Sequence, residues 1–229
     1  MKAIAIDSAS PVLTISAINE DLKSTVILDI GMHQSERILV EIERVLNDVN
    51  LKVADLEFAA LCKGPGTFTG LRLSFAALKA LQLNAHFPIY AFDSLYVYAF
   101  PFLSIGKPIL SCLDAKKHRF YVSLFRKGQV AVESFDAELE QVKNILDTEE
   151  ELILTGPDAE YFAETYYEIN PNQKFTILGS EFSNTGFALL SLGKKAFDRG
   201  DEGLKDYEGP VYIRPSEAEE AKLAGEVVK

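Results

Sequence analysis

A glycine-rich connection near residue 64 constrains the fold of this chain more than any other feature. It joins an apolar, strand-like run over residues 56–62 to a helix-like run over residues 71–84, with three glycines and one proline within seven residues. Such a turn needs positive φ angles or close backbone contacts, both of which glycine permits. Because the first N–H groups of the following helix have no helical partners, the loop can hold an anion or a partner's backbone. The residues of this glycine loop are Gly64, Gly66, Thr67, Thr69 and Gly70.

The spacing of the glycines does not identify a known nucleotide-binding loop. It matches neither the dinucleotide pattern G-x-G-x-x-G nor the phosphate-loop pattern G-x-x-x-x-G-K-[ST], because Gly70 is followed by Leu71 and Arg72. A phosphate-binding loop and a purely structural tight turn are therefore both open at this point.

The first half of the chain predicts a mixed sheet flanked by helices. Three alternating runs joined by short turns indicate an antiparallel meander, and two later strands alternate with helices. The expected strands cover residues 2–7, 12–17, 22–28, 56–62 and 89–92, and the expected helices cover residues 35–48 and 71–84.

The second half repeats this order in a degraded form. The expected strands cover residues 109–114, 120–126, 130–135 and 152–155, and the expected helices cover residues 137–146, 158–168 and 184–199. Pro108 follows a break in the pattern and resists helix continuation. We therefore expect one lobe over residues 1–105 and a second over residues 106–229, with an edge strand at 211–213 and a frayed end from Glu217.

Composition limits the partners that this chain can hold alone. The net charge is −11 and the isoelectric point is about 4.8, whereas phosphate contacts depend on Lys and Arg. We therefore expect any nucleic acid to contact a more basic partner. Cys62 and Cys112 lie in apolar runs and are expected to be free, buried thiols. No run reaches the roughly 20 apolar residues that cross a bilayer, and no leader pattern precedes the first strand, so we expect a cytoplasmic protein without membrane contact.

Five blocks of the sequence resemble the TsaB (YeaZ) family, in that family's order, from near residue 4 to about residue 219. They read IDSAS, HQSERIL, GPGTFTGLRLSFAALKAL, DAKKHRFYVSLF and GPVYIRPSEAE. The resemblance implies a two-lobed actin-like fold (ASKHA, ribonuclease-H-like), in which each lobe is a mixed sheet with flanking helices. It also implies a non-catalytic scaffold that activates a TsaD-like enzyme, which makes threonylcarbamoyladenosine beside the anticodon of tRNA.

The block HQSERIL bears on whether the chain is an enzyme. Enzymes that resemble TsaD place two histidines at positions i and i+4 of this helix, adjacent on one face and suited to a divalent metal. Here His33 keeps the first position, but Arg37 stands at the second, and an arginine cation cannot ligate a metal. We therefore expect no catalytic residue and no metal site. We also expect no cofactor of the chain's own beyond weak nucleotide binding, with ATP used by the partners.

The resemblance also implies the partners and their docking surface. They are a TsaD-like catalytic subunit and a TsaE-like ATPase, with tRNA bound only through the complex and a homodimer when the chain is alone. The interface is expected on the first-lobe helices at residues 33–48 and 71–84. Its expected residues are His33, Arg37, Ile38, Ile42, Leu71 and Phe75.

Two other functions stay open from the residues alone. An ATP-dependent transferase or kinase of the same fold would need phosphate loops and a catalytic carboxylate. Asp7 stands where such enzymes carry their first phosphate loop, but no glycine lies between Asp7 and Val12, so a turn-forming role is favoured. A metallopeptidase would need the second metal ligand that Arg37 replaces.

Overall fold

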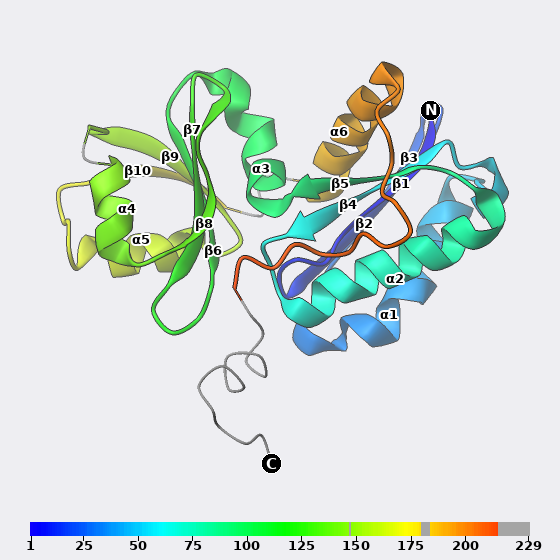
Figure 1. The fold of residues 1–229 in the computed structure, drawn as a ribbon, viewed down its shortest axis with the longest axis horizontal. Coiled ribbons are helices and arrows are strands. Elements are labelled where there is room, and N and C mark those ends of the chain that lie inside the picture. Colours follow the sequence, from blue (N-terminus) through cyan, green and yellow to red (C-terminus); the bar gives the residue numbers. More distant parts are fainter. Residues whose placement is uncertain (147, 180–183, 215–229) are drawn as a thin grey trace, which may run out of the picture.

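Two five-stranded mixed sheets with flanking helices form the structure, a computed structural model that describes residues 1–146, 148–179 and 184–214 (Figure 1). The strand orders are β3-β2-β1-β4-β5 and β10-β9-β6-β7-β8. In each sheet, the three strands that come first in the sequence form an antiparallel meander. The first of them also pairs in parallel with the fourth strand, and the fourth pairs in parallel with the fifth. This duplicated topology is that of the two-lobed actin-like fold expected from the sequence.

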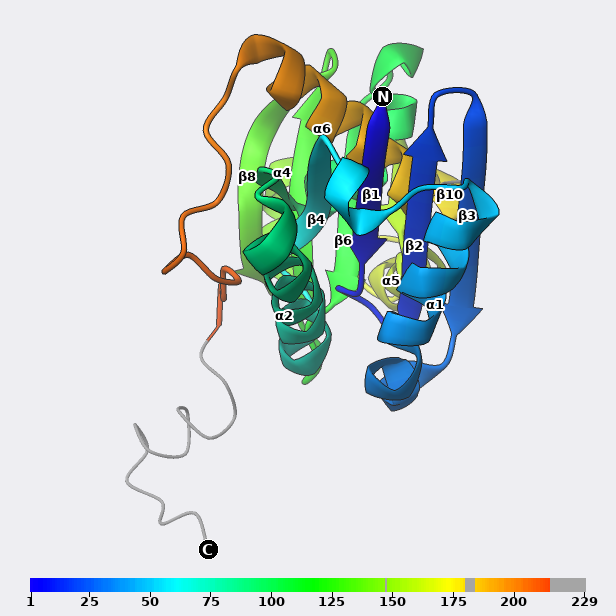
Figure 2. The ribbon, with the colours of Figure 1, turned by 90° about the vertical axis from the view of Figure 1, so that its right-hand side faces the viewer.

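The first lobe holds the strands that surround the glycine loop. They are β1 (Lys2–Asp7), β2 (Val12–Asn19), β3 (Leu22–Asp29), β4 (Phe58–Gly64) and β5 (Ile89–Asp93). Helices α1 (Gln34–Asp48) and α2 (Phe68–Ala85) cover one face of this sheet, and α6 (Thr185–Arg199) lies behind it (Figure 2). Along β1, Ile4 and Ile6 face α1 and α2, whereas Ala3 and Ala5 face the opposite side.

The second lobe repeats the arrangement with a core of its own. Its strands are β6 (Ile109–Asp114), β7 (Phe120–Arg126), β8 (Gln129–Ala137), β9 (Glu151–Gly156) and β10 (Lys174–Gly179). Helices α4 (Leu139–Leu146) and α5 (Ala159–Tyr167) pack on one face, where Val142, Phe162 and Tyr166 are buried. The strand β10 was not expected from the sequence.

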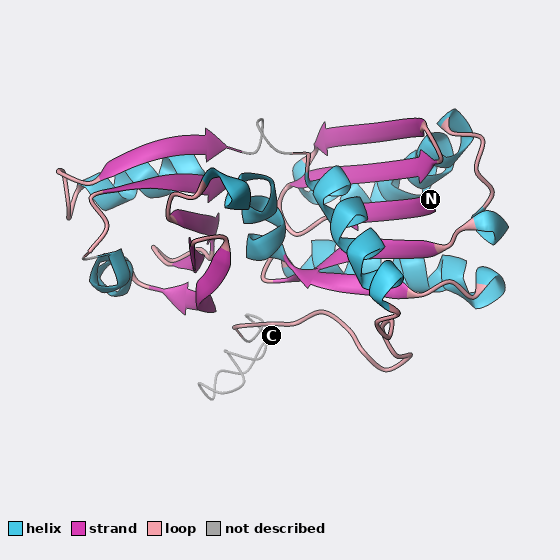
Figure 3. Cartoon of the chain, turned by 90° about the horizontal axis from the view of Figure 1, so that it is seen from above, coloured by secondary structure: helices cyan, strands magenta, loops and turns pink. Residues whose placement is uncertain are grey.

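The helices between the two sheets correct the expected division of the chain. Helix α6 (Thr185–Arg199) packs on β1, β2 and β4 of the first sheet, so its expected place in the second lobe is wrong. Helix α3 (Ser94–Ala99) was not expected from the sequence; it follows β5 and packs mainly on β6, β7 and β9 of the second sheet, and also on β4 of the first. Seen from above, both helices lie near the junction of the two lobes (Figure 3).

Small residues explain why α6 can approach the first sheet so closely. A Cβ atom added to Gly193 would lie 2.6 Å from the Phe58 ring, and one added to Gly186 would lie 2.0 Å from the Ser16 hydroxyl. The strands offer alanines on the same side, including Ala3 and Ala60. The close contact therefore depends on small residues on both surfaces, the glycines of α6 and the alanines of the strands.

The segment over residues 201–214, which we call the C-terminal strap, returns to the first lobe after α6. It forms no edge strand at 211–213: its Val211 N–H donates to the carbonyl oxygen of Lys63 at 2.7 Å, and no ladder follows. The expected frayed end from Glu217 lies outside the described residues. Within the described residues, no helix is long and apolar enough to cross a membrane.

Candidate partner surface and interlobe cavity

The glycine loop between β4 and α2 is filled by the chain's own backbone. A Cβ atom at Gly66 would lie 2.6 Å from the carbonyl oxygen of Ala9, and one at Gly70 would lie 1.9 Å from that of Ser8. The Thr67 N–H donates to the Ala9 carbonyl oxygen at 2.7 Å. The turn after β1 therefore occupies the space that two of the three glycines leave.

Glycine is needed at Gly64, the first glycine of the loop, for a different reason. Gly64 has a φ angle of +121°, which L side chains rarely adopt, and its added Cβ would lie 2.3 Å from the carbonyl oxygen of Val211 in the C-terminal strap. The strap is therefore seated directly on Gly64.

Neither loop threonine caps helix α2 with its side chain. Thr67 is the N-cap residue, but its hydroxyl donates to the Ser8 carbonyl oxygen at 3.4 Å, outside the helix. Thr69 is exposed. In return, the Ser8 hydroxyl donates to the carbonyl oxygen of Gly70 at 2.7 Å. These contacts join the β1–β2 turn to the loop and favour the structural reading of its glycines.

Asp7 lies buried at the end of β1 and forms the turn that the sequence suggested. Its Oδ1 atom accepts the backbone N–H of Ala9 at 3.1 Å. Burial raises the pKa of the Asp7 carboxyl, although the Ala9 N–H and the side chains of Thr185 and Cys62 lower it in part. Both cysteines are free and buried, and burial raises the pKa of each thiol.

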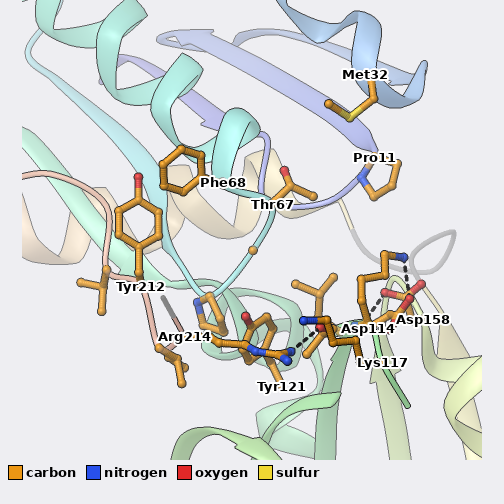
Figure 4. Close-up of a pocket in the computed structure, with 17 residues that line it drawn as sticks. Pro11, Met32, Thr67, Phe68, Asp114, Lys117, Tyr121, Asp158, Tyr212 and Arg214 are labelled. Carbon is orange, nitrogen blue, oxygen red and sulfur yellow. Dashed lines mark hydrogen bonds and ion pairs between the residues drawn. The ribbon is translucent and has the colours of Figure 1, made fainter. Parts of the chain in front are cut away.

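A cavity of about 350 Å³ lies between the lobes, at the glycine loop (Figure 4). Its walls come from residues 65–68, from residues 113–117 at the end of β6 and in the β6–β7 turn, and from strap residues 211–214. Within the turn, the Lys116 ammonium pairs with Asp114 at 2.6 Å, and the Asp114 N–H donates to Asp158 at 2.8 Å. Charged groups of this cavity thus have partners inside the chain.

Three consecutive residues of the β6–β7 turn adopt left-handed backbone conformations. The φ angles of Lys116, Lys117 and His118 are +63°, +55° and +59°. For residues other than glycine this conformation costs roughly 1 kcal/mol or more each. The Asp114 carboxylate offsets part of the cost, because it accepts the Lys116 N–H at 2.7 Å.

His33, which directly precedes helix α1, and Arg37 on that helix both lie at the surface, but in different settings. His33 is exposed and pairs with Glu36 at 2.9 Å. Arg37 pairs with Glu41, one turn further along the helix. The Glu41 side chain is only 1% exposed and also lies 3.5 Å from Arg44. The sequence analysis missed Glu41, although its spacing of four residues from Arg37 is a signal for such a pair. Within the described residues, no group of three or more His, Cys, Asp or Glu is placed to hold a metal ion.

The four expected apolar interface residues point inward. Ile38, Ile42, Leu71 and Phe75 are at most 4% exposed and belong to the cores that hold the helices on the sheet. Their expected role as outward-facing anchors is therefore wrong. The periodicity that identified them marks the buried face of an amphipathic helix.

Other residues of the same helices give them an exposed apolar surface. Leu39 and Val40 on α1 are 63% and 58% exposed, and Leu83 on α2 is 76% exposed. Ala76 and Ala80, also exposed, lie on the same side of α2 as Leu83 because they are spaced by three to seven residues. We call Leu39, Val40, Ala76, Ala80 and Leu83 the α1–α2 surface. Leu83 was not identified from the sequence.

The strand topology and the interlobe junction define an actin-like α/β protein made of two ribonuclease-H-like lobes. The chain belongs to the family described as TsaD, tRNA N6-adenosine threonylcarbamoyltransferase, whose model matches residues 30–219, and within it to the TsaB (YeaZ) proteins.

One of the relatives that support this assignment matches nearly the whole chain, and another matches less than half of it. The tRNA threonylcarbamoyladenosine biosynthesis protein TsaB of Bacillus subtilis is 24% identical over 228 residues, which is 96% of each chain. The Escherichia coli protein of the same name is 25% identical over 43% of each chain. A crystal structure of a Pseudomonas aeruginosa protein with similarity to peptidase YEAZ shares the fold, with a TM-score of 0.75 and 20% identity over 93% of this chain and 99% of that one.

Proposed function

We propose that this chain takes part in the biosynthesis of threonylcarbamoyladenosine in tRNA, as a non-catalytic partner that binds and activates a TsaD-like enzyme. A curated relative that it matches over 96% of its length carries the name of this pathway. The observation that carries the partner role is the α1–α2 surface, on which Leu39 and Leu83 are largely exposed.

An exposed surface of this kind has the anatomy of a protein interface. Leu39 and Val40 lie one helical turn from the charged residues Glu36, Arg37 and Glu43, which are also exposed on α1. Burying a large apolar side chain contributes roughly 1.5–3 kcal/mol, so Leu39 and Leu83 can supply much of a moderate affinity. His33 and Arg37 remain candidate rim contacts.

The geometry of the glycine loop supports a role without catalysis. A loop that cradles phosphates has glycines so that the ligand can approach the backbone. Here the spaces beside Gly66 and Gly70 are taken by the backbone of Ala9 and Ser8. We therefore favour the partner role over the transferase or kinase alternative, and we propose that ATP is used by the partners.

The acidic charge of the chain favours contact of the tRNA with other subunits. With a net charge of −11, the chain repels tRNA, so the basic contacts belong to the TsaD-like subunit. We further propose that a TsaE-like ATPase joins the complex, and that two copies of the chain pair through the α1–α2 surface when the enzyme is absent. A surface that pairs with itself would be isologous.

The test measures binding of surface variants to the TsaD-like enzyme of the same organism by calorimetry. Leu39→Glu and Leu83→Glu should fold normally, because both side chains face solvent, and should bind about tenfold or more weakly. The matched control is Val130→Glu, an exposed apolar residue on β8 of the other lobe, which should bind at full strength.

Size-exclusion chromatography on the same variants tests the homodimer. The two surface variants should shift towards the monomer and the control should not. Wild-type affinity in folded Leu39→Glu and Leu83→Glu would place the interface elsewhere on the molecule.

A further inference from the structure

Lys79 on helix α2 holds the C-terminal strap through backbone carbonyl oxygens, and among the described residues it forms no ion pair with a carboxylate. The Lys79 ammonium donates to the backbone carbonyl oxygens of Lys205 and Asp206 at 3.2 and 2.8 Å, and to that of Glu208. An ammonium group has three donors, and three carbonyl oxygens of one turn accept them. This contact joins residues more than 120 positions apart in the sequence.

The next part of the strap is held at the glycine loop by a hydrogen bond and by ring contacts. The Val211 N–H bonds to Lys63. One residue further on, the Tyr212 ring lies 4.9 Å from the Phe68 ring, and its hydroxyl accepts the Nε–H of Arg72 at 3.0 Å. The Arg72 guanidinium also lies over the Phe68 ring, 3.7 Å from its centroid.

The end of the strap reaches the other lobe. The Arg214 guanidinium donates to the carbonyl oxygen of Ala115, in the β6–β7 turn, at 3.0 Å. Strap residues 211–214 line the interlobe cavity together with that turn (Figure 4). A single segment is thus bound to both lobes and lines the cavity between them.

We propose that the C-terminal strap is a releasable latch that sets the spacing of the two lobes and closes the interlobe cavity. This inference concerns the lobes and is independent of the partner surface proposed above. Most strap contacts are hydrogen bonds near the surface, which contribute little net stability each because water can replace them. The side chains of Tyr207 and Val211 are 83% and 48% exposed, so little apolar area holds the segment down. Segments with this balance open at a small fraction of the global unfolding free energy.

The test measures the distance between the lobes by double electron–electron resonance. Spin labels are placed at Asn47→Cys on α1 and Glu164→Cys on α5, both exposed positions. Cys62 and Cys112 are buried with raised thiol pKa values, so they compete little for the label. A chain that ends after Gly200 is compared with one that ends after Arg214, because the pair differs only in the strap.

If the strap is a latch, the chain that ends after Gly200 should give a broader or longer distribution of distances between the two labels. The chain that ends after Arg214 should give the same distribution as the full-length protein. If both folded chains give the same distribution, the strap does not set the lobe spacing and the proposal is overturned. If the shorter chain does not fold, the same distance is measured in the full-length double variant Lys79→Met with Arg214→Gln. Its distribution should be broader or longer than that of the control Lys52→Met, which changes an exposed lysine, and equal distributions would overturn the proposal.

Hydrogen exchange of a single amide gives a second readout. In Lys79→Met the Val211 N–H, which bonds to Lys63, should exchange at least about tenfold faster than in Lys52→Met, a factor of ten being about 1.4 kcal/mol. Equal exchange rates in the two variants would contradict the role of Lys79 in holding the latch.

Discussion

At Gly70, an added Cβ atom would collide with the carbonyl oxygen of Ser8, and at Gly66 one would collide with Ala9. Neither glycine is among those with positive φ. Glycine is therefore needed at these two positions because the β1–β2 turn lies against the loop. The sequence predicted that the loop required either a positive φ or a close approach, and only the structure shows which requirement applies to which residue.

Replacing Gly70 by alanine tests this close approach. Glycine-to-alanine changes inside an unobstructed helix add about 1 kcal/mol of stability. Here we expect a loss of about 1–3 kcal/mol, because the Cβ forces the turn and the helix apart. Urea unfolding measures the difference, with Gly209→Ala as the control, since nothing lies within 4 Å of an added Cβ there. A Gly70→Ala protein as stable as the wild type would show that the turn yields easily.

The buried Asp7 carboxyl predicts a pH dependence of stability. Burial raises its pKa in the folded state, whereas the unfolded chain has a value near 3.9. The stability that the protonated form contributes is therefore complete below about pH 3.9 and is lost as the pH rises through the folded-state pKa.

The variant Asp7→Asn isolates this effect, because asparagine keeps the oxygen that accepts the Ala9 N–H but does not ionise. The free energy of unfolding of the wild type minus that of the variant should fall as the pH rises from about 4, and level off above the raised pKa. Urea titrations between pH 4 and 8 measure it. A difference that stays constant or grows with pH would mean that Asp7 is not a carboxyl with a raised pKa.

At the scale of whole elements, the sequence predicted the strands and long helices better than their packing. The meander β1–β3, helices α1 and α2, and strands β6–β9 follow from alternation and helical spacing, with ends that differ by a few residues. Helix α3 was missed because its residues favour strands; the Asp93 side chain, which accepts the Tyr96 N–H at 3.0 Å, starts the helix.

The packing of α6 across the lobe boundary had only a weak signal in the sequence. Gly186 and Gly193 are seven residues apart and so share one side of the helix, matching the alanines of β1 and β4. Periodicity indicates which face of a helix is buried but not which sheet it meets. For the same reason, Ile38 and Leu71 were identified as contact residues but assigned to a partner rather than to the core.

A substitution at Gly193 tests the observed place of α6. Gly193→Val should cost about 1–3 kcal/mol, because the side chain would enter the space of the Phe58 ring. Ser191→Val, at an exposed position of the same helix, is the matched control. Hydrogen exchange should increase in β1 and β4 of the first lobe in particular. Increased exchange confined to β6 and β9 would contradict the packing of α6 on the first sheet.

The whole molecule combines a closed glycine loop, an acidic surface and two exposed helices in one lobe. The sequence predicted the family and the duplicated sheet, because five blocks in order and the strand pattern both survive in a single chain. It did not predict the exchange of helices between the lobes or the strap, because these depend on contacts between residues far apart in the chain. These features are the ones that support the role proposed above, beside a more basic enzyme.

The most direct test of that role is the formation of threonylcarbamoyladenosine on tRNA in a reconstituted reaction. The TsaD-like enzyme of the same organism is assayed with its substrates and remaining partners, with and without this chain, and the modified nucleoside is quantified by mass spectrometry. We predict at least about a tenfold increase when the chain is present, a smaller increase with Leu39→Glu, and no product from the chain without the enzyme. Full product formation in the absence of the chain, or product formation by the chain alone, would contradict the account.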